Sequence, residues 1–234
     1  MAINYSPKII RDGLVLCLDA ANPRSYPGTG TTWFDLSGNN NHFTIFNSPT
    51  YSLSRFTFDG VNDYMRSTNT INLSSTNAIT VDVGFKVPTV TTNVMVFEFT
   101  ANWNTNAGAF GAFTNSNGGL ASSPTTDNDI HTNSSAEAED FNVSDITARS
   151  IYSFVYQSGV GTSLYYNSAL APTLRNSTVS SFTGFANNYL YIGSRGGTSS
   201  FGILELDYIR IYNRALTADE VKTNFNALRG RYGI

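Results

Sequence analysis

The sequence predicts an all-β fold, an antiparallel β-sandwich with jelly-roll topology that carries one C-terminal helix. Short strand-like runs recur along the 234 residues, and turns rich in Gly, Asn and Ser separate them. One segment near the C-terminus has the pattern of an amphipathic helix. Neither an internal repeat nor a linker interrupts the series, so we expect a single domain over residues 1–234.

The strand candidates alternate or run apolar, and each ends at turn residues. In chain order they are residues 14–19, 55–58, 78–87, 94–100, 109–114, 151–157, 163–166, 189–193 and 203–212. The turn around Gly159 and Gly161 joins two of them into a hairpin. The stretch 115–135 is polar, with two adjacent glycines and a proline, and is predicted to be a loop.

The helix is predicted over residues 217–229. Thr217 and Glu220 have the spacing of a capping box, in which each side chain hydrogen-bonds the backbone amide of the other residue. Gly230 stands where a left-handed residue would end the helix. The apolar stripe, which we expect to lie on the sandwich, consists of Val221, Phe225 and Leu228.

The composition excludes several classes of protein. Only 13% of the residues are charged and the formal net charge is −3, so the chain has no basic patch for nucleic acid. No apolar run is long enough to insert into a membrane. Aromatic residues make up 13% of the chain, which argues against disorder. Cys17 is the only cysteine, lies in an apolar run, and is expected to be buried.

Five stretches, in this order, resemble the concanavalin A-like lectin/glucanase superfamily in its laminin-G-like branch. They are WFDLSGNNNH at 33–42, FTFDGVNDY at 56–64, the hairpin at 152–156 and 163–167, YIG at 191–193, and LDYIRIYNRAL at 206–216. The resemblance implies the same jelly-roll fold over nearly the whole chain. It implies less about function, because this fold carries lectins, hydrolases, receptor modules and capsid parts.

The superfamily includes glucanases with a Glu-x-Asp strand motif followed by a second Glu. Glu205 and Asp207 match the first two carboxylates, but the second Glu is absent and Arg210 follows instead. A retaining glycosidase needs a nucleophile and an acid, and an arginine does not donate a proton at neutral pH. We therefore expect no enzymatic activity, and we expect Asp207 to be structural, held by amides or by a metal.

Two loops are candidate calcium sites, although no cofactor is certain. Asp35 and Asn39 belong to a run of alternating oxygen-bearing side chains that could wrap Ca²⁺. Asp59 and Asp63 form a second cluster, since laminin-G-like modules commonly carry one calcium. The alternative is that both loops are hydrogen-bonded turns without metal.

A carbohydrate site is predicted at Asn102, Trp103 and Asn104. An exposed aromatic ring can stack on a sugar while neighbouring amides bind its hydroxyls, and this loop follows a strand candidate, where binding residues often lie. The alternative is that Trp103 packs under its loop.

The resemblance leads to a functional hypothesis. The opening segment 12–23 is similar to that of phage members of the family, and the first eight residues show no secretory signal. We expect a non-enzymatic virion-surface protein of a tailed phage, such as a head decoration, fibre or tail-associated module. It would assemble in the host cytoplasm and be exposed after lysis. The expected partners are other capsid or tail proteins, further copies of the chain in a homo-oligomer, and a host-surface glycan. The alternatives are a secreted cellular lectin or adhesin and a divergent polysaccharide hydrolase.

Overall fold

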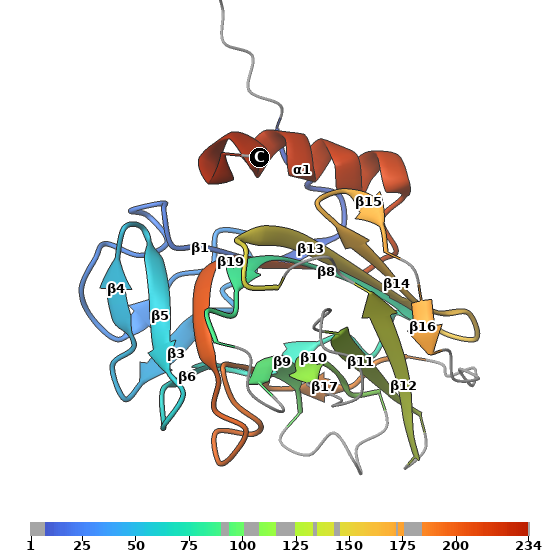
Figure 1. The fold of residues 1–234 in the computed structure, drawn as a ribbon, viewed down its shortest axis with the longest axis horizontal. Helices are drawn as coiled ribbons and strands as arrows, with labels where there is room; N and C mark the ends of the chain where they lie inside the picture. Colours follow the sequence, from blue (N-terminus) through green and yellow to red (C-terminus); the bar gives the residue numbers. More distant parts are fainter. Residues whose placement is uncertain are drawn as a thin grey trace, which may run out of the picture.

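The computed structural model of the chain is a β-sandwich of two large antiparallel sheets, called sheet A and sheet B below. One helix packs on the outer face of sheet A (Figure 1). The structure describes residues 8–89, 94–100, 108–115, 125–132, 135–142, 146–171, 173–175 and 184–233. The predicted fold class is confirmed. No helix in the described part of the chain has the length and apolar character needed to cross a membrane.

Sheet A lies beneath the helix. Its strands, in order across the sheet, are β15 (Ala169–Leu170), β14 (Gly161–Tyr166), β13 (Ser150–Gln157), β8 (Ala78–Lys86), β19 (Ile203–Tyr212), β5 (Arg55–Asp59) and β4 (Thr50–Ser52). β1 (Leu14–Asp19) also belongs to this sheet. β5 pairs with the first half of β19, and β1 pairs with the second half.

Sheet B forms the opposite layer. Its strands, in order, are β16 (Thr173–Arg175), β12 (Ser135–Asn142), β11 (Thr125–Thr132), β10 (Phe110–Asn115), β9 (Val94–Phe99), β18 (Leu190–Ile192), β6 (Tyr64–Ser67), β3 (Phe43–Phe46) and β2 (Thr32–Trp33). A separate short pair consists of β7 (Ile71–Asn72) and β17 (Asn187–Asn188).

The core lies between the two sheets and is rich in aromatic rings. The Trp33 and Phe56 rings are 4.9 Å apart, and the Tyr26 ring lies 4.7 Å from Phe56. Farther along the sandwich, the Phe97 ring of sheet B meets the Phe154 ring of sheet A edge-on at 5.4 Å. Alternate residues of both sheets therefore interlock, as the period-two pattern of the strands predicts.

The structure explains why the motif YIG at 191–193 ends in a glycine, Gly193. Its φ is 77°, in the left-handed region that glycine adopts without strain. A Cβ at this position would lie 2.7 Å from the ring of Phe58 in the core. The glycine thus lets the backbone beyond β18 pass close to the opposite sheet.

One predicted loop is wrong. Within the stretch 115–135, the structure places strand β11, which pairs with β10 on one side and with β12 on the other. Polar sequence without apolar alternation carries no strand signal. Backbone pairing with a neighbouring strand decides the conformation instead.

Helix α1 (Ala218–Tyr232) begins with the predicted capping box. The Thr217 hydroxyl accepts from the Glu220 amide at 3.3 Å, and the Glu220 carboxylate accepts from the Thr217 amide at 2.9 Å. The predicted end is wrong, because the helix continues past Gly230 and its left-handed cap is Gly233, with φ 71°. A glycine is tolerated inside a helix, so its presence alone does not mark the end.

The helix packs on the outer face of sheet A, over β13, β8 and β19 (Figure 1). Leu228 and Phe225 contact Tyr208 and Ile151. Val221 packs with Tyr212 and Leu216 in a second small cluster. The apolar stripe therefore lies on the sandwich, as predicted.

A β-bulge in β19 determines which side chains face the helix. Leu206 pairs with Phe85 and Tyr208 pairs with Gly84, so Asp207 is an extra residue in the strand. Beyond the bulge, Ile209 points into the core and is fully buried, and Tyr208 and Arg210 point outward.

The bulge can be tested by truncating Ile209. Strict alternation from Glu205 would place Ile209 on the outer face, whereas the bulge places it in the core. Ile209→Ala should therefore lower the free energy of unfolding by about 2–5 kcal/mol, measured by denaturant titration. Ile203→Ala, at the half-buried start of the same strand, is the control and should cost about 1 kcal/mol or less. Equal losses in the two variants would contradict this register.

Candidate functional site

The predicted carbohydrate residues Asn102, Trp103 and Asn104 lie outside the described residues. The carbohydrate site in this loop stays a prediction.

The first predicted calcium loop is bound to β1 by hydrogen bonds. The Asp35 carboxylate accepts from the amides of Cys17 at 2.8 Å, Ser37 at 2.9 Å and Asn41 at 3.0 Å. The side-chain amide of Asn39 donates to carbonyl oxygens of β1 at 3.2 Å. These contacts hold the loop against the strand.

The second predicted calcium loop is a tight turn after β5. The Asp59 carboxylate accepts from the Val61 amide at 2.8 Å and from the Asn62 amide at 3.3 Å, and the hydrogen bond from Val61 contributes most to lowering the pKa of Asp59. Asp63 accepts from the Asp59 amide at 3.1 Å, and burial raises the pKa of Asp63. Within the described ranges, no three acidic, histidine or cysteine side chains group together as metal ligands. Calcium binding at either loop stays a prediction.

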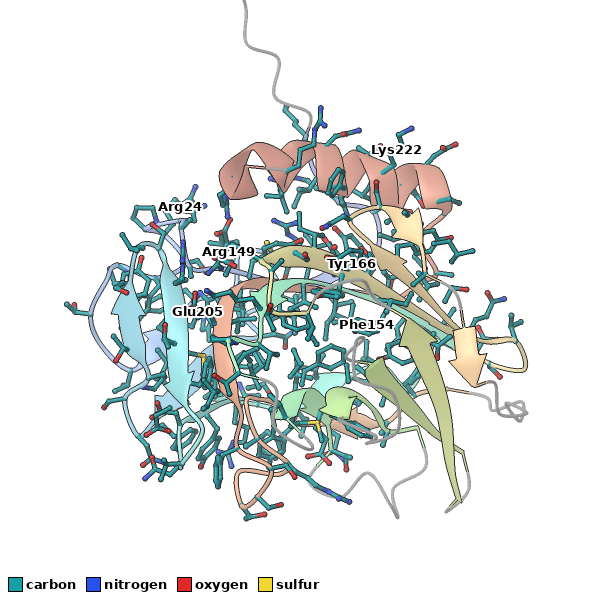
Figure 2. All side chains as sticks on the ribbon, viewed as in Figure 1. Arg24, Arg149, Phe154, Tyr166, Glu205 and Lys222 are labelled. Atoms are coloured by element: carbon teal, nitrogen blue, oxygen red, sulfur yellow. The ribbon has the colours of Figure 1, made fainter. Side chains whose placement is uncertain are left out.

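Glu205 and Asp207 do converge, but they converge on cations. Arg149 bridges the two carboxylates, contacting both of them. Lys86 lies 3.0 Å from Glu205, and Arg55 lies 3.4 Å from Glu205 and 3.8 Å from Asp207. Figure 2 shows Arg149 and Glu205 near the start of β19. These five residues are called the β19 ion cluster below.

The pKa values of Glu205 and Asp207 shift in opposite directions, but the contacts of the β19 ion cluster are not those of a glycosidase pair. Burial opposes ionisation of Glu205, but Lys86, Arg149 and Arg55 outweigh it and hold the pKa of Glu205 below its ordinary value. Burial raises the pKa of Asp207, although Arg149 opposes the rise. A guanidinium thus binds both carboxylates, whereas a retaining enzyme places the sugar between them. Asp207 is held by Arg149 and Arg55, whereas the sequence suggested amides or a metal.

A second cluster lies on the outer face of sheet B, where the sequence predicted no site. Thr44 pairs with Arg66 and Phe46 pairs with Tyr64 across β3 and β6, and all four side chains point away from the core. The Phe46 and Tyr64 rings stack at 4.4 Å, with 5° between their planes. The Arg66 guanidinium lies 5.6 Å from the centre of the Phe46 ring and 4.7 Å from that of Tyr189.

We call Phe46, Tyr64, Arg66 and Tyr189 the Arg66 ladder. All four side chains are half-buried. Among the residues that the structure describes, Arg66 has ring contacts but neither a carboxylate nor a hydrogen-bond acceptor as partner, and its Nε is buried without one. The ladder thus combines aromatic surface with a cation whose hydrogen-bonding capacity is unused. Its members lie up to 143 positions apart in the chain (189 − 46), so the only local signal is the alternation within β3 and β6.

The role of Arg149 in the β19 ion cluster can be tested by removing its charge. Arg149→Met should lower the free energy of unfolding by about 3 kcal/mol at neutral pH, because the buried Asp207 carboxylate loses its bridging partner. Without Arg149 the raised pKa of Asp207 rises further, so the loss should shrink as the pH falls and Asp207 becomes neutral.

Urea titrations at pH 7 and pH 4 measure this effect. Arg55→Met is the matched control and should cost about 1 kcal/mol, because Arg55 is 27% exposed and lies farther from both carboxylates. A loss for Arg149→Met that stays the same at both pH values would argue against a charge effect.

Comparison with solved structures identifies botulinum neurotoxin binding domains as similar folds. The receptor-binding domain of the C/D mosaic serotype has a TM-score of 0.68 at 12% identity, covering 92% of this chain and 51% of that one. The serotype D ligand-binding domain in complex with N-acetylneuraminic acid has a TM-score of 0.66 at 12% identity, covering 92% and 51%. A third structure comes from work on botulinum neurotoxin type C, whose cell entry depends on interaction with two ganglioside molecules. It has a TM-score of 0.67 at 14% identity, covering 94% of this chain and 52% of that one. The chain spans about half the length of these structures, and such low identities establish the fold alone.

Comparison with sequences is more specific. No curated protein matches the chain. A family model described as the concanavalin A-like lectin/glucanases superfamily matches residues 58–222, which is more than half of the chain. The match includes most of the stretches that carry the resemblance in the sequence, and the sandwich of sheets A and B agrees with it. The chain therefore belongs to the concanavalin A-like lectin/glucanases superfamily.

Proposed function

We propose that the chain is a non-enzymatic glycan-binding module, and that the Arg66 ladder holds an acidic sugar. The observation that carries the proposal is Arg66 itself, a half-buried guanidinium between aromatic rings with no acidic partner among the described residues. A carboxylate is the group that best matches the planar fork of an arginine.

The rest of the Arg66 ladder suits a sugar ring. Phe46 and Tyr64 offer apolar surface to carbon-bound hydrogens, while the Tyr64 and Tyr189 hydroxyls can bond sugar hydroxyls. One structure of similar fold contains N-acetylneuraminic acid, which is a sugar acid. The shared fold is the link between that structure and an acidic-sugar ligand for this chain.

The non-enzymatic part of the proposal rests on the β19 ion cluster. Its two carboxylates are neutralised by Arg149, Arg55 and Lys86. A hydrolase would need one carboxylic acid free to donate a proton to the leaving group. The described residues of this strand therefore favour binding over catalysis.

We further propose that this module acts on the surface of a tailed-phage virion, together with other capsid or tail proteins and further copies of itself. This part rests on the similarity of residues 12–23 to phage members of the family. A secreted cellular lectin or adhesin is the alternative. Both would use the same glycan-binding face.

The Arg66 ladder can be tested with a glycan array that holds sialylated oligosaccharides and their neutral counterparts. The wild type should bind the acidic members, and Arg66→Gln should weaken this binding about tenfold or more, because one charge-assisted contact is lost. Arg24→Gln removes the same charge from an exposed site on another loop and should bind like the wild type.

Two results would overturn the ladder as the site. One is equal binding by Arg66→Gln and Arg24→Gln. The other is loss of binding in Trp103→Ala while Arg66→Gln binds normally, which would locate the sugar at the Asn102–Trp103–Asn104 loop predicted from the sequence.

The virion assignment requires a separate measurement. Mass spectrometry of purified particles from the source phage should detect the chain at a stoichiometry comparable to known structural proteins. If every particle preparation lacks the chain, the virion proposal is wrong and the secreted lectin is favoured. The glycan-array result is independent of this outcome.

A further inference from the structure

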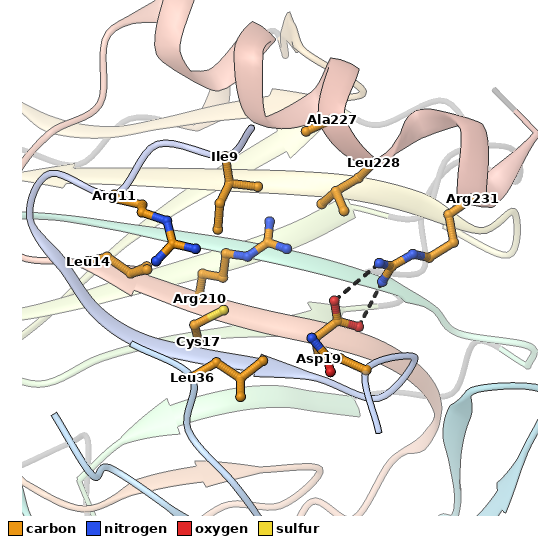
Figure 3. A pocket seen from close by; sticks show the side chains of 11 residues that line it. Ile9, Arg11, Leu14, Cys17, Asp19, Leu36, Arg210, Ala227, Leu228 and Arg231 are labelled. Atoms are coloured by element: carbon orange, nitrogen blue, oxygen red, sulfur yellow. Dashed lines mark hydrogen bonds and ion pairs between the residues drawn. The ribbon is translucent and has the colours of Figure 1, made fainter. Parts of the chain in front are cut away.

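A pocket of about 230 Å³ lies between α1 and the outer face of sheet A (Figure 3). β1 and β19 form its floor through Cys17, Asp19 and Arg210, and the helix contributes Leu228 and Arg231. The segment before β1 closes one side with Arg11. The pocket is on the opposite side of the sandwich from the Arg66 ladder.

Positive charge dominates the pocket lining. Three arginines line it, against one carboxylate, Asp19. Arg231 uses that carboxylate in a two-point contact of 2.8 and 3.2 Å. Arg11 has no carboxylate partner in the part of the chain that the structure describes. Burial raises the pKa of the Cys17 thiol, so the floor holds no thiolate to balance the arginines.

Arg210 is the unusual member of the lining. Its side chain is 3% exposed, its Nη1 lies 3.3 Å from the Asp82 carboxylate, and its guanidinium lies 4.4 Å from the centre of the Tyr208 ring. Its Nε is buried and has no partner among the described residues. An arginine carries five N–H donors, and unpaired buried donors are costly. Arg210 brings a positive charge to the pocket floor.

The remaining walls limit what can enter. Leu14, Leu36 and Leu228 provide apolar sides, and the volume is smaller than that of sites for drug-sized ligands. Figure 3 shows Arg11, Arg210 and Arg231 around the space between helix and sheet. The chemistry that fits is a compact group with several acceptor oxygens and negative charge.

We propose that this pocket binds a small oxyanion, a phosphate, sulfate or short carboxylate, between Arg11 and Arg210. The bound anion would connect the segment before β1 with strand β19, which is far from it in the sequence, beneath helix α1. Binding should therefore stabilise the folded chain. This site goes beyond the proposed glycan site and does not depend on it.

Thermal unfolding and titration calorimetry with sodium phosphate, sodium sulfate and sodium acetate, against sodium chloride at the same ionic strength, test the proposal. At least one oxyanion should raise the Tm by several degrees more than chloride does, and should bind with one site per chain. A response to phosphate and sulfate without acetate indicates a tetrahedral anion, and a response to acetate indicates a carboxylate. Each result supports the site.

Phosphate and sulfate also stabilise proteins non-specifically, so matched variants are needed. Arg11→Gln removes an exposed charge from the pocket and should weaken binding at least tenfold. Arg229→Gln makes the same change at an exposed helix position outside the pocket and should bind like the wild type. The proposal is overturned if no oxyanion exceeds chloride, or if the two variants respond equally to the oxyanions.

Discussion

The central position of β19 is the constraint on which the rest of the structure depends. This strand is the last in the chain, yet it pairs with β8 along one edge and with β5 and β1 along the other. Sheet A is therefore incomplete until residues 203–212 are in place. Such pairing between distant segments carries a high entropic cost of loop closure, which is recovered only when the core forms. The motif at 206–216 therefore includes most of the central strand of sheet A.

The two faces of β19 have different physical requirements. Leu206, Ile209 and Ile211 enter the core, where apolar area removed from water stabilises the fold. On the outer face, Asp207 and Arg210 are buried under other elements although both are ionic. Burial of charge is tolerated only with partners. Asp207 has Arg149, and Arg210 has Asp82. The core covers one face of β19, and other elements cover its outer face. The β19 ion cluster and the pocket beside Arg210 both result from burying ionic side chains on that outer face.

The candidate sites could be predicted from the sequence only in part. Glu205 and Asp207 were recognisable from their spacing, and so was the missing second Glu. The three cations that neutralise them come from β5, β8 and the residue before β13, and no spacing in the sequence relates these positions. The Arg66 ladder was not found at all, because Arg66 and Tyr189 become neighbours only through the pairing of β6 with β18. In the loops of Asp35 and Asp59, the residue types alone predict the hydrogen-bonded turns that the structure contains.

The sequence by itself determined the fold class, most strands of the two sheets and the start of the helix. These features depend on local chemistry: alternation along a strand, turn residues, and a capping box within four residues. Only the tertiary structure decided that a polar stretch is strand β11, that the helix ends at Gly233, and that a bulge at Asp207 reverses the facing of Ile209. Strand β11 and the bulge depend on partners that lie on other segments of the chain, whereas the cap at Gly233 is a local bond to the Arg229 carbonyl. A backbone ladder, a packed face or an ion pair has no signature in the residues of one side alone.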